Sequence, residues 1–291
     1  MSGDPGRMLV TGDLHFRSRP PGDECTLELA RFVCDSGADA FAIAGDVGET
    51  DPASYGACLD LFAGFGGAKL VVPGNHDLWT TDGDSLEKYR DVLPRIAAEH
   101  GFHALDTAPL TLGATAFIGS IGWYDYSFRN PDLPVPLAQY ERKELPGVCV
   151  WNDGRFVHWD LTDAEFTDRC VRRLLRHYRE VEGRVETVVA VLHHVAFRGL
   201  LYGPADAAHE FCRAYMGSER LGRLLEDCPK VRYVFCGHRH GPNDGRFGRI
   251  HAFNIGSEYL VKRLIDFDLR TGEHETHVFG PAREEGAQSQ G

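Results

Sequence analysis

Five short polar motifs in the sequence carry side chains that can bind metal ions. Their carboxylate, imidazole and amide groups suit manganese, iron, zinc or magnesium better than metals that prefer thiolates. In two motifs the potential ligands stand two residues apart, so in an extended segment their side chains fall on the same side. Each motif alone is weak evidence, but five in one chain indicate one shared metal site. The motifs are Asp13-Leu14-His15, Gly45-Asp46, Gly74-Asn75-His76-Asp77, His193-His194 and Gly237-His238-Arg239-His240.

Each motif directly follows a short apolar run that is typical of a buried strand. In open α/β sheets, ligands bind just outside the carboxyl ends of the strands. Five strands that end in metal-binding groups at one edge would therefore bring those groups together. The predicted strands are residues 8–10, 40–44, 69–72, 187–192 and 231–236.

Helical patterns alternate with these strands, which predicts an α/β fold whose mostly buried sheet is flanked by helices. Further strands at 115–119, 251–255 and 261–269 are expected, and the last two lie close together, so part of the sheet should be antiparallel. We expect one domain over residues 1–281 and a flexible polar tail at 282–291. The predicted helices are residues 26–36, 55–65, 85–100 with a possible kink at Pro94, 163–181 and 219–227.

The series GDLH, GD, GNHD, HH and GHRH resembles the signature of the calcineurin-like metallophosphoesterase family, over the span from Asp13 to His240. The resemblance implies a fold of two facing mixed β-sheets flanked by helices, a four-layer sandwich, with two metal ions at the strand ends. It also implies roles for single residues. Asp13, His15 and His240 would hold one metal, Asp46 would bridge both, and Asn75, His193 and His238 would complete the second. His76 would be the acid near the leaving group, oriented by Asp77.

Two details of the sequence argue against particular subgroups of this family, the purple acid phosphatases and the protein Ser/Thr phosphatases. The choice between two adjacent histidines as the metal ligand stays open. The run GDVGET after Asp46 has no tyrosine at the short offset used by purple acid phosphatases, so no iron–tyrosinate site is expected. Pro73 precedes Gly74 where protein Ser/Thr phosphatases of the family carry arginine. The expected metals are manganese or iron, with zinc, nickel or magnesium as alternatives. His193 is preferred over His194 as the ligand because it directly follows the strand.

One long segment, residues 122–158, has little periodicity and is rich in tryptophan, tyrosine, proline and aspartate. A loop of this length in a compact domain is usually a lid or is disordered, and aromatic content argues against disorder. We therefore expect a cap inserted at about residues 122–160. Candidate substrate-binding residues are Tyr124 in the cap, as part of an aromatic wall, and the arginines Arg17, Arg198 and Arg239. Ordinary packing or surface salt bridges are the alternative interpretation for all four.

Composition limits the substrate and the compartment. The formal net charge of −12 and the pI of about 5.6 argue against a long polyanion, so nucleic acid is an unlikely partner. No apolar run is long enough to span a membrane, and the first residues lack a secretory signal, so a cytoplasmic protein is expected. The eight cysteines form no C-x-x-C pair and are expected to be reduced thiols.

These observations favour a hydrolase that acts on a small phosphate monoester at a binuclear metal centre. A phosphodiesterase, for a cyclic nucleotide or another diester, is the alternative. A protein phosphatase or nuclease fits less well because of the missing arginine and the acidic charge. A non-catalytic scaffold should have lost metal ligands, whereas all seven positions here hold competent residues.

Overall fold

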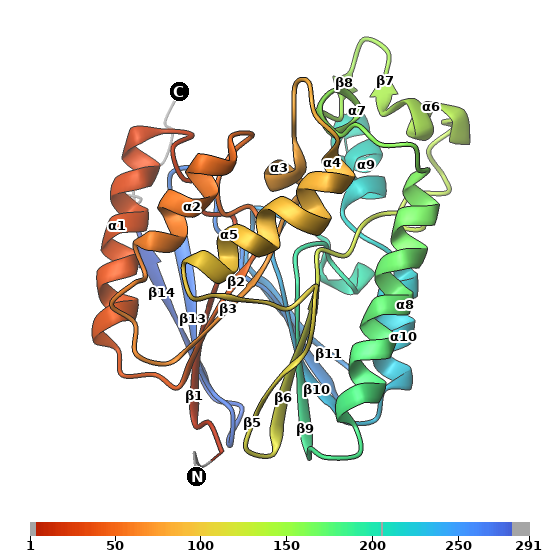
Figure 1. Cartoon of the computed structure of the whole chain (residues 1–291). Coiled ribbons are helices and arrows are strands. Elements are labelled where there is room, and N and C mark those ends of the chain that lie inside the picture. Colours follow the sequence, from red (N-terminus) through yellow and green to blue (C-terminus); the bar gives the residue numbers. More distant parts are fainter. Residues whose placement is uncertain (1–3, 205, 281–291) are drawn as a thin grey trace, which may run out of the picture.

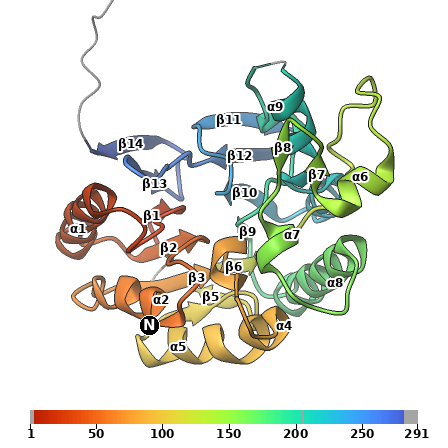
Figure 2. The ribbon, with the colours of Figure 1, turned by 90° about the horizontal axis from the view of Figure 1, so that it is seen from above.

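The protein folds into two six-stranded sheets that face each other, as the computed structural model shows for residues 4–204 and 206–280 (Figures 1 and 2). The tail predicted at 282–291 lies outside the described residues. The first sheet has the order β14-β13-β1-β2-β3-β4 and the second has the order β11-β12-β10-β9-β6-β5. The strands of the first sheet are β1 (Arg7–Thr11), β2 (Ala40–Ala44), β3 (Ala68–Val72), β4 (His103–Ala104), β13 (Lys262–Asp268) and β14 (His274–Phe279). Those of the second are β5 (Leu110–Leu112), β6 (Thr115–Ser120), β9 (Thr187–Leu192), β10 (Val231–Cys236), β11 (Asn243–Phe247) and β12 (Ile250–Asn254).

Both sheets are mixed, as expected from the closely spaced late strands. Strands β1 to β4 are parallel, and β13 pairs antiparallel with β1. In the second sheet β6, β9, β10 and β12 are parallel, while β5 and β11 pair antiparallel at the two edges. The parallel central strands of both sheets therefore end at one edge of the sandwich, where the polar motifs follow them.

Helices cover the outer face of each sheet (Figure 1). Helices α1 (Pro20–Asp35), α2 (Pro52–Asp60) and α5 (Leu93–Glu99) lie on the first sheet, and α8 (Asp163–Val181) and α10 (Glu219–Asp227) lie on the second. The shorter helical segments are α3 (Asn75–Leu78), α4 (Ser85–Glu87), α6 (Leu137–Arg142), α7 (Asp153–Phe156), η2 (Arg198–Leu200), α9 (Ala207–Cys212) and η3 (Arg213–Tyr215). The predicted four-layer arrangement of two facing sheets between helices is confirmed.

Alternating side chains of each central strand build two different cores. In β1, Met8 and Val10 point between the sheets, where they join a cluster that includes Phe235 of β10. Leu9 points the other way and packs beneath the helices of the first sheet with Leu29 of α1. Because both faces of these strands are buried, their sequences are continuously apolar rather than alternating. This burial fixes the register of the strands and hence the places where they end.

The helix predicted over residues 85–100 is present but changes its winding. It runs as α4, then a π-helical segment η1 (Lys88–Val92), then α5. Pro94 lies at the start of α5, where its missing N–H removes an intrahelical hydrogen bond. The irregularity expected near Pro94 is therefore a local change of helix type, which we attribute to this missing hydrogen bond.

The segment expected as a cap contains short elements and lies over the strand-end edge of the sandwich (Figure 1). These elements are α6, α7 and the hairpin of β7 (Glu144–Leu145) and β8 (Cys149–Val150). The aromatic rings at its start are core residues, because Trp123 and Tyr124 are fully buried and Tyr126 is 6% exposed.

No helix within residues 4–204 and 206–280 is both long and apolar enough to cross a membrane. The eight cysteines are all free thiols in the structure.

Candidate metal centre

The loops after β1, β2, β3, β9 and β10 bring the seven predicted ligands to one place. Four of these residues, Asp13, His15, Asp46 and His238, have positive φ angles of 52°, 44°, 48° and 69°. Left-handed backbone at non-glycine residues costs about 1–3 kcal/mol each and clusters at functional sites. The surrounding hydrogen bonds hold this conformation, since Asp13 N donates to Gly45 O and His15 N donates to Asp46 O, both at 2.9 Å.

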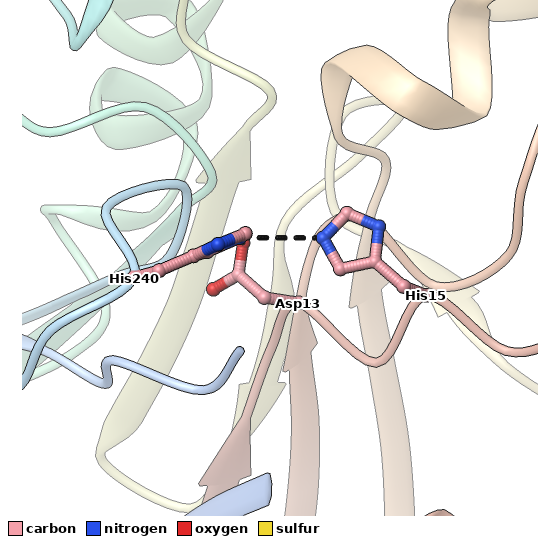
Figure 3. A group of neighbouring side chains, drawn as sticks. All are labelled: Asp13, His15 and His240. Carbon is pink, nitrogen blue, oxygen red and sulfur yellow. Dashed lines mark hydrogen bonds and ion pairs between the residues drawn. The ribbon is translucent and has the colours of Figure 1, made fainter. Parts of the chain in front are cut away.

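Asp13, His15 and His240 form the first group of potential ligands (Figure 3). Nε2 of His15 lies 3.3 Å from Nε2 of His240, which in turn lies 3.9 Å from Asp13 Oδ1. Asp13 is fully buried, and its Oδ2 has no hydrogen-bond partner. A buried carboxylate oxygen without a donor is costly unless a cation compensates it.

Asp46, Asn75, His193 and His238 form the second group. His193 Nε2 lies 3.0 Å from Asn75 Oδ1, 3.1 Å from His238 Nδ1 and 3.5 Å from Asp46 Oδ1. His193 Nδ1 lies 2.9 Å from the carbonyl oxygen of Ala44 and must therefore carry the proton, because a carbonyl only accepts. The lone pair on Nε2 then faces two oxygens, an arrangement that a shared cation would stabilise.

Asp46 lies between the two groups. Its Oδ2 is 3.6 Å from Nε2 of His15 in the first group, and its Oδ1 faces His193 in the second. Burial raises the pKa of Asp13 to about 8 and that of Asp46 well above its ordinary value. Burial also lowers the pKa of His193 well below its ordinary value, so its imidazole is neutral, the form that binds metals. The two groups thus fit a pair of divalent cations that share Asp46.

The second of the two adjacent histidines belongs to neither group of close ligand atoms. His194 Nδ1 lies 2.9 Å from the carbonyl oxygen of Ile121, and its ring packs 4.3 Å from that of His238, measured between centroids. This geometry favours His193 as the ligand.

His76, the predicted acid, lies beside the first group and contacts a carboxylate that the sequence did not point out. Glu49 Oε2 lies 3.5 Å from His76 Nδ1, and Glu49 Oε1 lies 3.3 Å from Nδ1 of His15. Burial alone would raise the pKa of Glu49, but its contacts with the two imidazoles lower it below its ordinary value. Glu49 stands three residues after Asp46, so an acid at a short offset from the strand end was the signal that could have identified it.

Asp77 was expected to orient His76, but its carboxylate has other partners. It accepts hydrogen bonds from the backbone N–H groups of Val47, Gly48 and Gly74, at 3.2, 3.0 and 2.7 Å. Asp77 therefore joins the loop after β2 to the loop after β3. The carboxylate next to the His76 ring is that of Glu49.

A cavity of about 600 Å³ opens beside both groups of ligands. Arg239 lies in its wall, whereas Arg17, Tyr124 and Arg198 are not among the lining residues. Tyr124 is fully buried, and Arg198 is paired with Glu219 at 3.0 Å, which corrects the expectation that these two face a substrate. The aromatic residues that do line the cavity are Trp79, Trp151, Tyr202 and Tyr259.

A sandwich of this kind with potential metal ligands at its strand ends is typical of metal-dependent hydrolases. The calcineurin-like phosphoesterase family matches residues 6–242, and the chain belongs to this family of phosphoester hydrolases. No curated protein matches the sequence.

Solved structures share the fold at low sequence identity. A phosphopantetheinyl hydrolase from Mycobacterium tuberculosis is 21% identical with a TM-score of 0.68, covering 89% of this chain and 92% of its own. TT1561 of Thermus thermophilus is 14% identical with a TM-score of 0.58, covering 94% and 98%. A dimetal phosphatase from Danio rerio is 14% identical with a TM-score of 0.57, covering 95% and 100%. Likeness at this level of identity concerns the fold alone.

Proposed function

We propose that this protein hydrolyses the phosphate monoester of a small molecule at a binuclear metal centre. The observation that carries the proposal is the cavity of about 600 Å³ beside the ligand groups, whose lining includes Val150 and Trp151 of the proposed cap. Small-molecule sites typically have volumes of roughly 300–1,000 Å³ and mostly apolar walls with a few polar groups. A cavity of this size suits a compact ester better than a polymer.

Asp13, His15 and His240 would hold one metal, and Asn75, His193 and His238 would hold the other, with Asp46 shared. Manganese and iron suit this mixture of carboxylate, amide and imidazole donors. Such ions, when bound, make hydroxide available near neutral pH and stabilise charge on the phosphoryl oxygens.

His76 would protonate the leaving oxygen. Its Nδ1 faces Glu49, which leaves Nε2 as the ring atom available to the cavity. Trp79 stacks on the His76 ring with centroids 3.6 Å apart and limits its rotation. A positioned general acid of this kind contributes about 10²–10⁴-fold to the rate.

Arg239 supplies fixed positive charge in the cavity wall, which favours the dianion of a monoester. Its guanidinium stacks 3.6 Å from the centroid of the Tyr202 ring. Nη1 donates to Gly241 O at 2.6 Å, and Nη2 donates to Tyr202 O at 2.5 Å. A guanidinium held in this way loses little further freedom when it meets a phosphate.

A phosphodiester is the second candidate, and the aromatic wall favours it. Trp151, Tyr202 and Tyr259 provide apolar surface that could accept a second alcohol group. The matched pair of p-nitrophenyl phosphate and bis-p-nitrophenyl phosphate separates the two, since both release the same chromophore.

With Mn²⁺ we expect kcat/KM to be higher for the monoester. A higher value for the diester would replace the monoester proposal with the second candidate. If the metal-loaded protein hydrolysed neither ester, nor any other phosphate ester in a screen, the proposed activity would be wrong. Asp46→Asn should lose both metals by elemental analysis, because Asp46 is the residue that both groups share.

A further inference from the structure

A buried carboxylate of the cap reaches the metal centre. Asp153, at the start of α7, is 1% exposed. Its Oδ1 accepts hydrogen bonds from Asn75 Nδ2 at 2.9 Å and from Trp79 Nε1 at 2.7 Å. Asn75 is one of the residues of the second ligand group, so a single hydrogen bond separates the cap from that group.

The other carboxylate oxygen of Asp153 also accepts two hydrogen bonds. Oδ2 of Asp153 accepts from the Tyr124 hydroxyl at 2.9 Å and from Trp151 Nε1 at 2.7 Å. Four donors around one buried carboxylate compensate the loss of its hydration. This arrangement leaves little freedom for the Asp153 side chain. The carboxylate therefore fixes the positions of the groups that donate to it.

The contact with Asp153 decides which end of the Asn75 amide faces the ligand group. A carboxylate only accepts hydrogen bonds, so the NH₂ end of the amide must face Asp153. The carbonyl end then points the opposite way, where Oδ1 lies 3.0 Å from His193 Nε2. If the amide were reversed, it would present N–H groups to the metal position and an oxygen to the carboxylate.

We propose that Asp153 is a positioning residue that holds the amide oxygen of Asn75 toward the second metal. Through the same carboxylate, the cap and two walls of the cavity, Trp79 and Trp151, are tied to metal binding. The inference rests on the binuclear centre of the proposed function, and it does not depend on which phosphate ester is the substrate. Residues that orient a metal ligand typically contribute about 10–100-fold to metal affinity.

The test is Mn²⁺ titration of the full-length protein by calorimetry, together with metal content after gel filtration. Asp153→Asn is close in size but can no longer accept from all four donors. We expect one of the two Mn²⁺ ions to bind about 10–100-fold more weakly and the other to bind as in the wild type. Two ions bound with wild-type affinity in this variant would overturn the proposal. If the wild type itself bound no Mn²⁺, the proposed binuclear centre would be wrong, and so would this inference, which rests on it.

Asp163→Asn is the matched control. Asp163 is also buried and accepts from Trp123 Nε1 at 2.8 Å, from Lys143 Nζ at 2.6 Å and from the Tyr126 hydroxyl. None of these donors belongs to a ligand group. Asp163→Asn should therefore lower the melting temperature and leave both Mn²⁺ affinities unchanged. Equal losses of affinity in the two variants would assign the effect to general loosening of the cap and overturn the proposal.

A second variant tests the same contact from the other side. Asn75→Asp introduces a carboxylate, which ordinarily strengthens a Mn²⁺ site, but here it would face Asp153 across a 2.9 Å contact. We expect its Mn²⁺ affinity to fall by at least about tenfold, and to recover in part when Asp153→Asn is added. Affinity at or above that of the wild type in Asn75→Asp alone would contradict a role for Asp153 at this position.

Discussion

His76 lies between two neighbours with different effects, the carboxylate of Glu49 and the indole of Trp79. Glu49 Oε2 lies 3.5 Å from His76 Nδ1, and the stacked indole keeps the ring in one orientation. A group held in this way is suited to proton transfer.

His76→Ala should keep both metals and lower kcat, and the size of the loss should depend on the leaving group. p-Nitrophenolate leaves without protonation, so we expect a small loss for its ester and about 10²–10⁴-fold for an alkyl phosphate. The measurement is kcat for both esters beside the metal content. Equal losses for both esters would argue against the role of His76 as the acid.

Glu49→Gln should lower kcat by about tenfold or more, because the His76 ring loses its orienting carboxylate. Asp77→Asn is the comparison, since Asp77 accepts three backbone hydrogen bonds. That variant should instead lose about 2 kcal/mol of stability, measured by urea unfolding. If instead Asp77→Asn lowered kcat and Glu49→Gln lowered only the stability, Asp77 would be the residue that orients His76.

The sequence could predict that the candidate ligands lie together because each follows an apolar strand, and parallel strands end together. Asp153 was missed because its partners lie on other segments and no local pattern marks it; it is 78 residues from Asn75 in the chain. Glu49 was missed although it stands only three residues after Asp46, because metal-binding and catalytic roles were assigned only to residues of the five motifs. Asp77 was assigned to His76 on the family resemblance, yet its carboxylate accepts three backbone hydrogen bonds in the structure.

At the scale of the elements, the turn from β3 into α3 must pass close to the loop after β2. A Cβ atom added at Gly74 would lie 2.1 Å from Asp46 Oδ1, a distance that no real contact allows. The glycine at this turn is therefore required by the close approach of two ligand loops.

Gly74→Ala should displace Asp46 and reduce metal binding, as elemental analysis can show. Gly66→Ala is the matched control, because a Cβ at Gly66 would meet nothing within 4 Å. This control should stay within about 0.5 kcal/mol of the wild-type stability and bind both metals. Full metal content in Gly74→Ala would show that the loops can separate without harm to the site.

The bounds of strands and helices with a strong hydrophobic pattern were predicted closely, whereas two polar strands were missed. The helix at 163–181 and the strands at 187–192 and 231–236 have the predicted bounds in the structure. The edge strands β11 and β14 were missed, because their sequences NDGRF and HETHVF have polar, largely exposed side chains. Pairing with a neighbouring strand, rather than local propensity, makes these segments extended.

At the scale of the whole molecule, the two ligand groups join the two sheets. Asp13, Asp46 and Asn75 follow strands of the first sheet, while His193 and His238 follow strands of the second. Bound metals would therefore link the two sheets at one edge of the sandwich.

Removing the metals should lower the melting temperature of the whole domain. Metal at 100 times its Kd stabilises a protein by about 2.7 kcal/mol, which corresponds to a shift of about 5–10 °C for a domain of this size. Differential scanning calorimetry with a chelator, and then with added Mn²⁺, measures the shift and its recovery. In Asp46→Asn the chelator should have no effect. A chelator that left the wild-type transition unchanged would show that metals do not link the sheets.

Strand β13, near the end of the chain, pairs with the first strand, β1, and this pairing affects folding during translation. Leu9 of β1 pairs with Asp266 of β13, and Lys262 Nζ donates to the backbone oxygen of Asp13 at 3.2 Å. Until residue 268 has left the ribosome, β1 lacks this neighbour and the loop that carries Asp13 lacks this contact. We therefore expect the nascent chain to acquire its metals only near the end of translation, so that a product cut short before β13 would be degraded rather than partly active.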